Sequence, residues 1–355
     1  MTSATSATSA IAIDLVSDTS TRPSRDMLAR MMAAETGDEQ RGEDPTVLQL
    51  CERIADLLGM DDALFLPSGT MCNQIAFLVH CRPGDEIIAA ESAHVFGSEG
   101  AGASALAGAQ FHTIATPNGI FDAAAVAAHI RAPRMRRPRS RVVAVEQTTN
   151  RGGGAVWSVD ELAAIVALAR EHSLAVHMDG ARLFNAVVAA NTPAKAFTAG
   201  FDSAWIDLSK GLGCPVGGVL AGSKDFIAEA WHWKHRLGGA MRQSGILAAA
   251  GLYALDHNVN RLAEDHANAR LFADTVRGLD GVTLSPENVV TNILFLELDE
   301  GLDAGTIGAK LQEKGMRIGV EGPHRMRVVT HLDVTRDGVK RAAEAFVEIV
   351  QGMSA

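Results

Sequence analysis

Short apolar runs alternate with segments of helical periodicity along the first 250 residues of the chain. Seven of these runs are short enough to be strands and are rich in buried residue types: residues 63–66, 86–89, 111–114, 142–145, 174–177, 204–208 and 218–221. Strands that are joined by helices and buried on both faces of a sheet have this pattern. The sequence therefore predicts an α/β fold with a mostly parallel seven-stranded sheet and helices on both faces.

One helix can be recognised from the residues at its ends. Asp44 is an acidic N-cap, Pro45 occupies the first helical position, and Gly59 follows the last apolar residue of the pattern. Acidic N-caps, proline at the first turn and glycine after the last turn are the usual boundaries of a helix. We expect this helix to open the large domain.

The pattern changes after Tyr253. A long polar helix at residues 256–279 precedes three strand-like runs at residues 292–298, 316–320 and 325–330. These runs fit a smaller C-terminal α+β domain with an antiparallel sheet. We predict a disordered tail at residues 1–13, an N-terminal arm at 14–44, a large domain at 45–255 and a small domain at 256–355.

Composition narrows the classes of partner. The chain has 355 residues, of which 47% are hydrophobic, and its formal net charge is −10. An acidic protein is not expected to bind nucleic acid or an anionic membrane surface, so a small-molecule partner is favoured. The first ten residues have neither the basic nor the apolar part of a signal peptide. Four cysteines without metal-binding spacing predict free thiols and a cytoplasmic location.

Two residues at predicted strand ends suggest a cofactor site. Asp179 closes one apolar run and Lys210 follows the next one. A carboxylate and an amine in these places can hold the ring nitrogen and the aldehyde carbon of pyridoxal phosphate. Alone, Asp179 could cap a turn or bind a metal, and Lys210 could be a solvated surface residue. The glycines and the proline at residues 211–218 favour tight packing around a ligand.

A second group of residues is suited to anions and proton transfer. Ser68, Gly69 and Thr70 join a strand to a helix, where free N–H groups can bind a phosphate. His94 follows another strand and can stack on a ring, or it is a structural histidine. The remaining candidates are three arginines that suit phosphate or carboxylate, with ordinary salt bridges as the alternative: Arg182, Arg242 and Arg327. The glycine-rich residues 97–108 lack the dinucleotide fingerprint, so no nicotinamide site is expected.

Eight strings together resemble the low-specificity L-threonine aldolases, in the beta-eliminating lyase family of fold type I pyridoxal-phosphate enzymes. The resemblance spans residues 14–335, and the order and spacing of its strings make it specific. The strings lie at residues 14–24, 42–46, 66–70, 93–94, 179–186, 208–213, 241–245 and 329–333.

The resemblance implies a role for each matching residue. Lys210 would form the Schiff base with pyridoxal 5'-phosphate, Asp179 would bind the ring nitrogen, and His94 would stack on the ring. The phosphate would bind the turn at residues 68–70. The substrate carboxylate would bind to three residues, of which Arg182 is also a cofactor contact: Ser17, Arg182 and Arg327.

The resemblance also implies an assembly. Arg242 matches an arginine that the family contributes to a phosphate across a subunit interface. A homodimer or homotetramer with active sites at the interface is therefore expected. No resident metal is predicted.

Three positions depart from the usual pattern of the family. Thr149 stands where a histidine is common, Arg41 where a tyrosine is frequent, and Ser98 where an aromatic residue is frequent. These changes make the side-chain end of the pocket more polar. They indicate a substrate with a polar or acidic side chain that contacts Arg41 and Thr149, although Arg41 could equally form a salt bridge between subunits.

The implied activity is cleavage of L-β-hydroxy-α-amino acids, such as threonine or allo-threonine, into glycine and an aldehyde. The alternative within the cofactor class is a lyase or dehydratase that eliminates a β substituent. A cofactor-free binding or scaffold protein is the alternative outside it, and the Asp179 and Lys210 pair argues against that reading.

Overall fold

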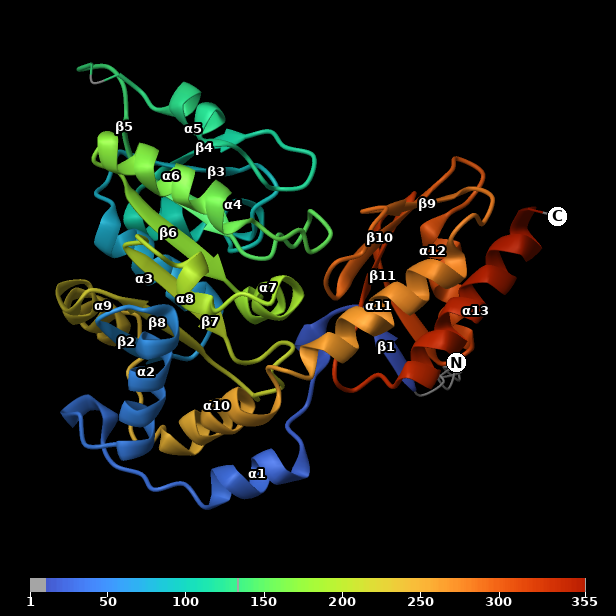
Figure 1. Cartoon of the computed structure of the whole chain (residues 1–355), viewed down its shortest axis with the longest axis horizontal. Helices are drawn as coiled ribbons and strands as arrows, with labels where there is room; N and C mark the ends of the chain where they lie inside the picture. The colour runs from blue at the N-terminus through green and yellow to red at the C-terminus, as the bar shows by residue number, and fades with distance from the viewer. Residues whose placement is uncertain (1–10, 133, 355) are drawn as a thin grey trace, which may run out of the picture. The chain divides into compact units, whose positions relative to one another are not determined.

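The structure is a computed structural model of the chain that describes residues 11–132 and 134–354. It contains a large unit, Arg22–Arg261, and a small unit formed by the residues up to Thr21 and from Leu262 onward (Figure 1). The predicted division near residue 256 and the separate arm at 14–44 differ from these bounds. Residues 1–10 of the predicted tail lie outside the described residues, and Ile13 already belongs to a strand.

The sheet of the large unit has the seven predicted strands and confirms the predicted fold class. Strands β5, β6 and β7 form its centre, and nearly all of their residues are buried. Neighbouring strands are parallel except around β8, which runs antiparallel to both β7 and β2. The strand order is β2 (Asp62–Leu66), β8 (Gly218–Gly222), β7 (Ser203–Asp207), β6 (Ala175–Gly180), β5 (Arg139–Glu146), β3 (Asp85–Ala90) and β4 (Gln110–Ile114).

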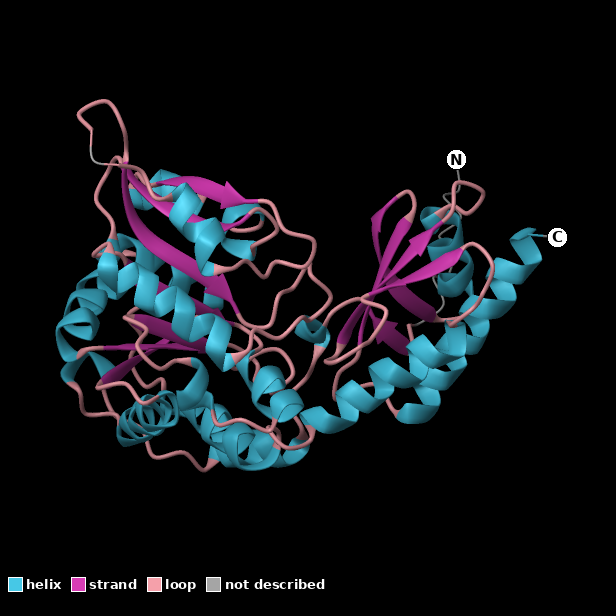
Figure 2. Cartoon of the chain, turned by 45° about the horizontal axis from the view of Figure 1, so that its top comes forward, coloured by secondary structure: helices cyan, strands magenta, loops and turns pink. Residues whose placement is uncertain are grey.

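Helices cover both faces of this sheet (Figures 1 and 2). They are α1 (Arg25–Met32), α2 (Pro45–Leu58), α3 (Gly69–His80), α4 (His94–Gly97), α5 (Ala123–His129), α6 (Val159–Glu171), α7 (Leu183–Ala190), α8 (Ala194–Phe197), α9 (Lys224–Arg236) and α10 (Gly245–His257). The chain before α10 also contains three short helical turns. Two are 3-10 turns, at Asp18–Ser20 and Glu39–Arg41, and one is a π-helical turn at Ala103–Ala107.

Helix α2 has the predicted boundaries. Asp44 Oδ1 accepts hydrogen bonds from the backbone N–H groups of Thr46 and Val47, at 3.2 and 3.1 Å. Gly59 ends the helix with φ at +64°, a left-handed conformation that glycine adopts without strain. The other carboxylate oxygen, Oδ2, accepts from the N–H groups of Gly37 and Gly245. One buried side chain therefore caps α2 and fixes the start of α10.

The sheet of the small unit has five strands, two more than predicted. The order is β1 (Ile13–Leu15), β11 (Met316–Gly322), β12 (Arg325–Val329), β10 (Ile293–Leu298) and β9 (Val282–Ser285). Strand β1 is parallel to β11, and the other pairs are antiparallel. Because β1 pairs only with the C-terminal part of the chain, the first described residues belong to the small unit.

Three helices pack against this small sheet: α11 (Leu262–Val276), α12 (Ala304–Glu313) and α13 (Arg336–Ser354). The predicted continuous helix at residues 256–279 is wrong at its start, because α10 ends at His257 and α11 begins at Leu262. Phe272 and Phe346, from α11 and α13, pack with ring centroids 6.2 Å apart in the core.

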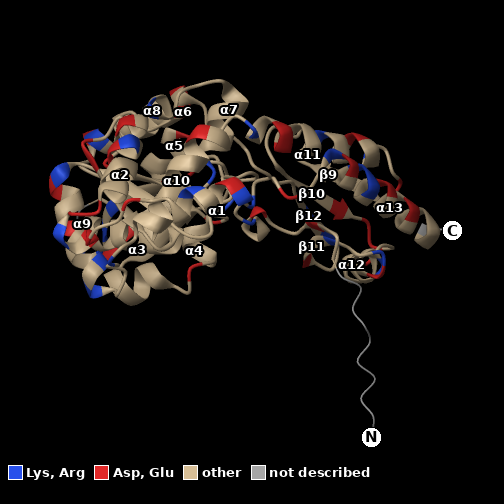
Figure 3. Ribbon diagram, turned by 90° about the horizontal axis from the view of Figure 1, so that it is seen from below, with Lys and Arg blue, Asp and Glu red and all other residues tan. Residues whose placement is uncertain are grey.

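The structure shows the distribution of the charged residues and the state of the cysteines in the folded chain. Acidic and basic residues are interspersed along α9 and α13 (Figure 3). The four cysteines are free and buried: Cys51, Cys72, Cys81 and Cys214. Among the described residues, no helix has the length and apolar character that a membrane crossing requires.

Candidate active site

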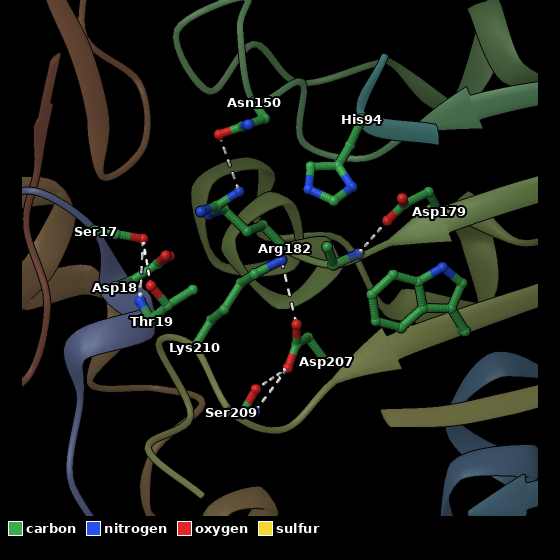
Figure 4. A network of polar contacts seen from close by, with 12 residues as sticks. Ser17, Asp18, Thr19, His94, Asn150, Asp179, Arg182, Asp207, Ser209 and Lys210 are labelled. Carbon is green, nitrogen blue, oxygen red and sulfur yellow. Dashed lines mark hydrogen bonds and ion pairs between the residues drawn. The ribbon is translucent and has the colours of Figure 1, made fainter. Parts of the chain in front are cut away.

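Several predicted site residues of the large unit lie where strands of its sheet end. Asp179 is near the end of β6, Lys210 follows β7, and His94 follows β3 at the start of α4. Ser68 follows β2 and is the N-cap of α3. Strands β2, β3, β6 and β7 run in the same direction, so these residues gather at one edge of the sheet. Figure 4 shows three of them, His94, Asp179 and Lys210.

Asp179 is a buried carboxylate with a fixed orientation. Its Oδ2 accepts a hydrogen bond from Asn73 Nδ2 at 2.9 Å, and its Oδ1 accepts one from the N–H of Ala181 at 3.0 Å. Burial raises the pKa of Asp179, whereas the positive charge of Lys210 and the bond from Asn73 act to lower it. A cationic group bound beside this carboxylate would favour its charged form further.

Lys210 is paired with the carboxylate that ends its own strand. Its Nζ lies 3.2 Å from Asp207 Oδ2, and its side chain is 18% exposed (Figure 4). Ser209 donates both its N–H and its hydroxyl to Asp207 Oδ1, at 2.7 and 2.8 Å. The Lys210 amine therefore stays accessible while Asp207 is held in place beside it.

His94 is held through one ring nitrogen. Its Nδ1 lies 3.0 Å from Glu99 Oε1, and 37% of its side chain is exposed, whereas the side chain of Glu99 is almost fully buried. The hydrogen bond to Glu99 raises the pKa of His94, although partial burial acts in the opposite direction. With Nδ1 bound to Glu99, Nε2 is the ring nitrogen left to exchange a proton with a ligand.

The side-chain amide of Asn73 connects Asp179 with the Glu99 carboxylate that holds His94. Asn73, on α3, donates from Nδ2 to both Glu99 Oε1 and Asp179 Oδ2, at 2.8 and 2.9 Å. Its Oδ1 accepts from Trp205 Nε1 at 2.7 Å. Asn73 therefore sets the positions of both buried carboxylates.

A third buried carboxylate belongs to the same edge. Glu146, at the end of β5, accepts from the N–H groups of His94 and Asn150, at 3.2 and 3.0 Å. Burial raises the pKa of Glu146 to about 7, and the charge of Asp179 adds to this shift. Arg182, which is 6% exposed, donates from Nη1 to Asn150 Oδ1 at 3.4 Å. The end of β5 thus contacts His94, and the loop after it contacts Arg182.

The turn before α3 has the features of an anion site. Ser68 caps α3 through a bond from the N–H of Met71 to its Oγ at 3.2 Å, and Ser68 and Thr70 are exposed. The first N–H groups of a helix have no partner within that helix. A side chain at Gly69 would overlap the ring of Trp205, so only glycine fits there. The ring of Trp205 therefore forms the floor beneath this turn.

Arg242 and Arg41 lie together on the surface of the large unit. Arg242 Nη1 is 2.8 Å from Asp38 Oδ2, and Arg41 Nε is 3.9 Å from the same oxygen. Their side chains are 62% and 73% exposed. Asp38 thus holds both guanidinium groups while leaving them accessible.

Thr149 is placed differently from the other candidates. It is 2% exposed, and its side chain packs closely against Gly119 and Gly152. Ser98, the second departure from the family pattern, is exposed at the end of α4. In the structure, therefore, Thr149 has very little surface for a substrate to contact.

Ser17 and Arg327 belong to the small unit. Ser17 Oγ accepts from the N–H and the hydroxyl of Thr19, at 3.2 and 2.8 Å (Figure 4). Arg327 donates from Nη2 to the carbonyl of Val16 at 3.3 Å, and its Nε lies 3.3 Å from Glu321 Oε1. Within this unit, then, Arg327 contacts the residue that precedes Ser17.

Sequence reasoning missed five residues of this edge: Asn73, Glu99, Glu146, Asn150 and Asp207. Asn73 had a signal, because it and Gln74 are the two amides in a run at residues 71–78 whose other members are apolar. A polar side chain on an apolar helix face must find a buried partner. Glu99 had none, because it lies in a glycine-rich loop where acidic residues are ordinarily solvated.

Residues 14–299 match the beta-eliminating lyase family. The low-specificity L-threonine aldolase of Escherichia coli K12 is 42% identical over 332 residues, which cover 93% of this chain and 97% of that protein.

Solved structures show the same fold. The threonine aldolase of Leishmania major is 23% identical with a TM-score of 0.82, covering 95% of this chain and 99% of that one. A serine palmitoyltransferase of S. paucimobilis with bound PLP and myriocin is 15% identical with a TM-score of 0.77, covering 97% and 88%. The chain therefore belongs to the beta-eliminating lyase family, which its motifs predicted, and it is similar along most of its length to the low-specificity L-threonine aldolases.

Proposed function

We propose that the protein is a pyridoxal-phosphate-dependent aldehyde-lyase. It cleaves L-β-hydroxy-α-amino acids such as threonine or allo-threonine into glycine and an aldehyde. One observation carries the proposal: the Asp179 carboxylate near the end of β6 and the Lys210 amine just after the neighbouring β7 lie at one edge of the sheet, in a chain 42% identical to a low-specificity L-threonine aldolase. Its likeness to that enzyme supports the reaction, and the residues of the edge support the cofactor.

The donor set fits a flat cationic ring that carries a phosphate. Asp179 supplies a buried carboxylate for the ring nitrogen, and Lys210 supplies an accessible amine for the aldehyde carbon. The turn at residues 68–70 supplies N–H groups for the phosphate. Because only glycine fits against Trp205 at position 69, no side chain at that position blocks the phosphate. His94 supplies an imidazole whose exposed face can stack on the ring.

When bound, pyridoxal phosphate withdraws electrons from the amino-acid Cα, so that a bond to that carbon can break. The residues of the chain bind and orient the substrate. Arg182 orients the substrate carboxylate, and Ser17 and Arg327 are the proposed partners from the small unit. Orientation decides which bond at Cα is weakened, because only a bond perpendicular to the ring gains from it.

His94 acts as the base. Its Nδ1 proton is held by Glu99, so Nε2 accepts the proton of the substrate hydroxyl, and the Glu99 carboxylate stabilises the imidazolium that forms. Thr149 cannot accept this proton at neutral pH and is buried. His94 therefore carries more of the proton transfer than in relatives with a second imidazole.

The assembly is part of the proposal. Arg242 is largely exposed, and it reaches a phosphate in a neighbouring subunit of a homodimer or homotetramer. Arg41, beside it on Asp38, contacts either a polar substrate side chain or that neighbouring subunit. The buried free thiols agree with a cytoplasmic enzyme.

The test uses the purified full-length protein with added pyridoxal phosphate. A panel of L and D β-hydroxy amino acids with aliphatic, aromatic and acidic side chains is scored for glycine and aldehyde. Wild type should release both, and Lys210→Ala should lose roughly 10³-fold or more of this activity. Lys224→Ala, at an exposed lysine on α9, is the matched control and should keep it. Equal turnover by Lys210→Ala would contradict the proposal.

Elimination of a β substituent is the second candidate, because the matching family is that of the beta-eliminating lyases. This reaction would give a 2-oxo acid and ammonia in place of glycine and an aldehyde. Product analysis of the same panel separates the two reactions. Activity on threonine alone would contradict the reading of Arg41 as a contact for a polar side chain.

A further inference from the structure

Behind Asp179, polar side chains form a continuous line through the interior of the large unit. His80 Nε2 lies 2.8 Å from Ser203 Oγ, and the same Oγ lies 2.8 Å from His177 Nδ1. His177 Nε2 lies 3.0 Å from Asn73 Oδ1, and Asn73 Nδ2 bonds Asp179. We call His80, Ser203, His177 and Asn73 the relay.

The elements explain why these residues meet. Asn73 and His80 are seven residues apart on α3, which is two turns and places them on one face about 10 Å apart along the axis. His177 and Ser203 are paired in register on β6 and β7 beneath that helix. Asn73, His177 and Ser203 are fully buried, so each polar atom must find its partner inside the protein.

The orientation of the Asn73 amide is fixed from both sides. Trp205 Nε1 is only a donor, so the atom that faces it at 2.7 Å must be the amide oxygen. On the other side, Glu99 Oε1 and Asp179 Oδ2 accept from the amide nitrogen, which faces them at 2.8 and 2.9 Å. Both constraints select the same orientation.

This orientation sets each further proton. His177 Nε2 faces the Asn73 oxygen and must carry a proton, because the other tautomer would bring two acceptors together in a buried place. The Nδ1 of a neutral His177 is then an acceptor, so the Ser203 hydroxyl donates to it. The hydroxyl oxygen in turn accepts from His80 Nε2. Every donor in the relay therefore points toward Asp179.

The two imidazoles stay neutral. Burial lowers the pKa of His177 to about 3, and burial lowers the pKa of His80 to about 4. Neither ring becomes charged near neutral pH, so the direction of the relay does not reverse. Aligned donors favour the charged form of the carboxylate at their end, because each bond polarises the next.

We propose that the relay positions Asp179 and keeps it charged, with its donors aligned from His80 at the end of α3 to the carboxylate at the end of β6. The inference rests on the proposed function in one respect, since a charged Asp179 matters because it faces a protonated ring nitrogen. The effect of the relay on Asp179 comes in addition to electrostatic interactions among the titratable groups at this edge. These groups are Lys210, His94, Glu99 and Glu146.

The first test reads the protons directly. Neutron diffraction from crystals of the full-length protein with bound pyridoxal phosphate should show deuterium on Nε2 of both His177 and His80. It should also show the Ser203 hydroxyl directed at His177 Nδ1. Deuterium on Nδ1 of His177 would overturn the relay. The same proton positions can be read from crystals without the cofactor, so a protein that binds no pyridoxal phosphate would contradict only the proposed function.

The second test asks whether the relay acts on Asp179. His177→Leu removes the donor, whereas the side-chain amide of His177→Gln can still reach Asn73. We expect His177→Leu to weaken pyridoxal phosphate binding roughly 10-fold, and His177→Gln to restore most of it. The pH midpoint of the cofactor's visible absorption should shift in His177→Leu and return in His177→Gln, which general loss of packing would not produce.

Ser203→Ala cuts the relay with a smaller change of shape and serves if His177→Leu does not fold. It should shift the same pH midpoint in the same direction by a smaller amount. Ser104→Ala is the matched control, because it removes a hydroxyl that bonds the carbonyl of Ala109 outside the relay. Wild-type affinity and an unchanged midpoint in both His177→Leu and Ser203→Ala would refute the action of the relay on Asp179.

Discussion

His94 Nδ1 and Glu99 Oε1 are 3.0 Å apart, and Glu99 is buried while His94 remains partly exposed. A buried carboxylate that faces one imidazole nitrogen favours the charged ring and fixes its orientation. The pair therefore makes the properties of His94 dependent on Glu99.

The first prediction concerns the pH dependence of this pair. Glu99→Gln should lower the pKa of His94, measured by NMR titration of the ring. The folded pKa of His94 is raised above 6.5. The pair's contribution to the free energy of unfolding is therefore complete below that pH and is lost as pH rises through the folded pKa.

Urea unfolding of wild type and Glu99→Gln should accordingly differ more near about pH 6 than near about pH 9. A difference that grew with pH would show that Glu99 acts through another group.

A second prediction separates proton transfer from binding. His94→Phe keeps an aromatic face but has no nitrogen to accept the substrate proton. It should lower glycine release roughly 10²-fold or more while the dissociation constant of pyridoxal phosphate stays within a few-fold of wild type. Turnover is followed by aldehyde release and binding by absorbance. Unchanged turnover would remove His94 from the role of base.

A third prediction concerns the floor of the turn before α3. Gly69→Ala places a methyl group into the ring of Trp205, which is 2% exposed and bonded to Asn73, so the ring cannot easily give way. Overpacking of this kind costs about 1–3 kcal/mol of unfolding free energy. Urea denaturation measures the loss, and pyridoxal phosphate binding should weaken as well.

The control for this substitution is Gly97→Ala on α4, where an added methyl group meets nothing within 4 Å. Its unfolding free energy should stay within about 0.5 kcal/mol of wild type. Equal effects of the two substitutions would mean that Trp205 does not constrain the turn.

A fourth prediction concerns Asp44, the residue that caps α2 and fixes the start of α10. Asp44 accepts four backbone N–H groups, two in the first turn of α2 and one each from Gly37 and Gly245. Asp44→Ala should cost about 3 kcal/mol or more, because a cap is lost and further buried N–H groups lose their acceptor. Asp122→Ala removes an exposed cap that accepts only from Ala125, and it should cost about 1 kcal/mol. Similar costs in urea unfolding would contradict this account of Asp44.

The central strands could be predicted because their signal is local. The seven runs of the large sheet are apolar, and the ends of α2 have strong boundary residues at Asp44 and Gly59. Strand β1 has three residues and pairs with β11, which begins at Met316, so no local pattern indicates it. The break between His257 and Leu262 was missed because the residues between them include no glycine or proline that would mark the end of a helix.

The residues of the candidate site also divide into those that the sequence pattern indicates and those that depend on tertiary contacts. Asp179 and Lys210 could be predicted to lie near one another, because parallel strands end at a common edge. Asn73 and Glu99 were not assigned, because their roles depend on contacts between α3, the loop after α4 and β6, which only the folded chain brings together. The burial of Thr149 also follows from tertiary packing against Gly119 and Gly152.

The antiparallel turn from β7 to β8 has a consequence for the motion of Lys210. Asp207 and Gly218 are paired across the two strands, and the N–H of Leu208 bonds the carbonyl of Gly217 at 3.0 Å. The N–H of Gly213 also bonds the carbonyl of Lys210 at 2.8 Å. The main chain at the lysine is thereby anchored on both sides. Torsion about the side-chain bonds of Lys210 can therefore displace its amine while the backbone at this residue stays anchored.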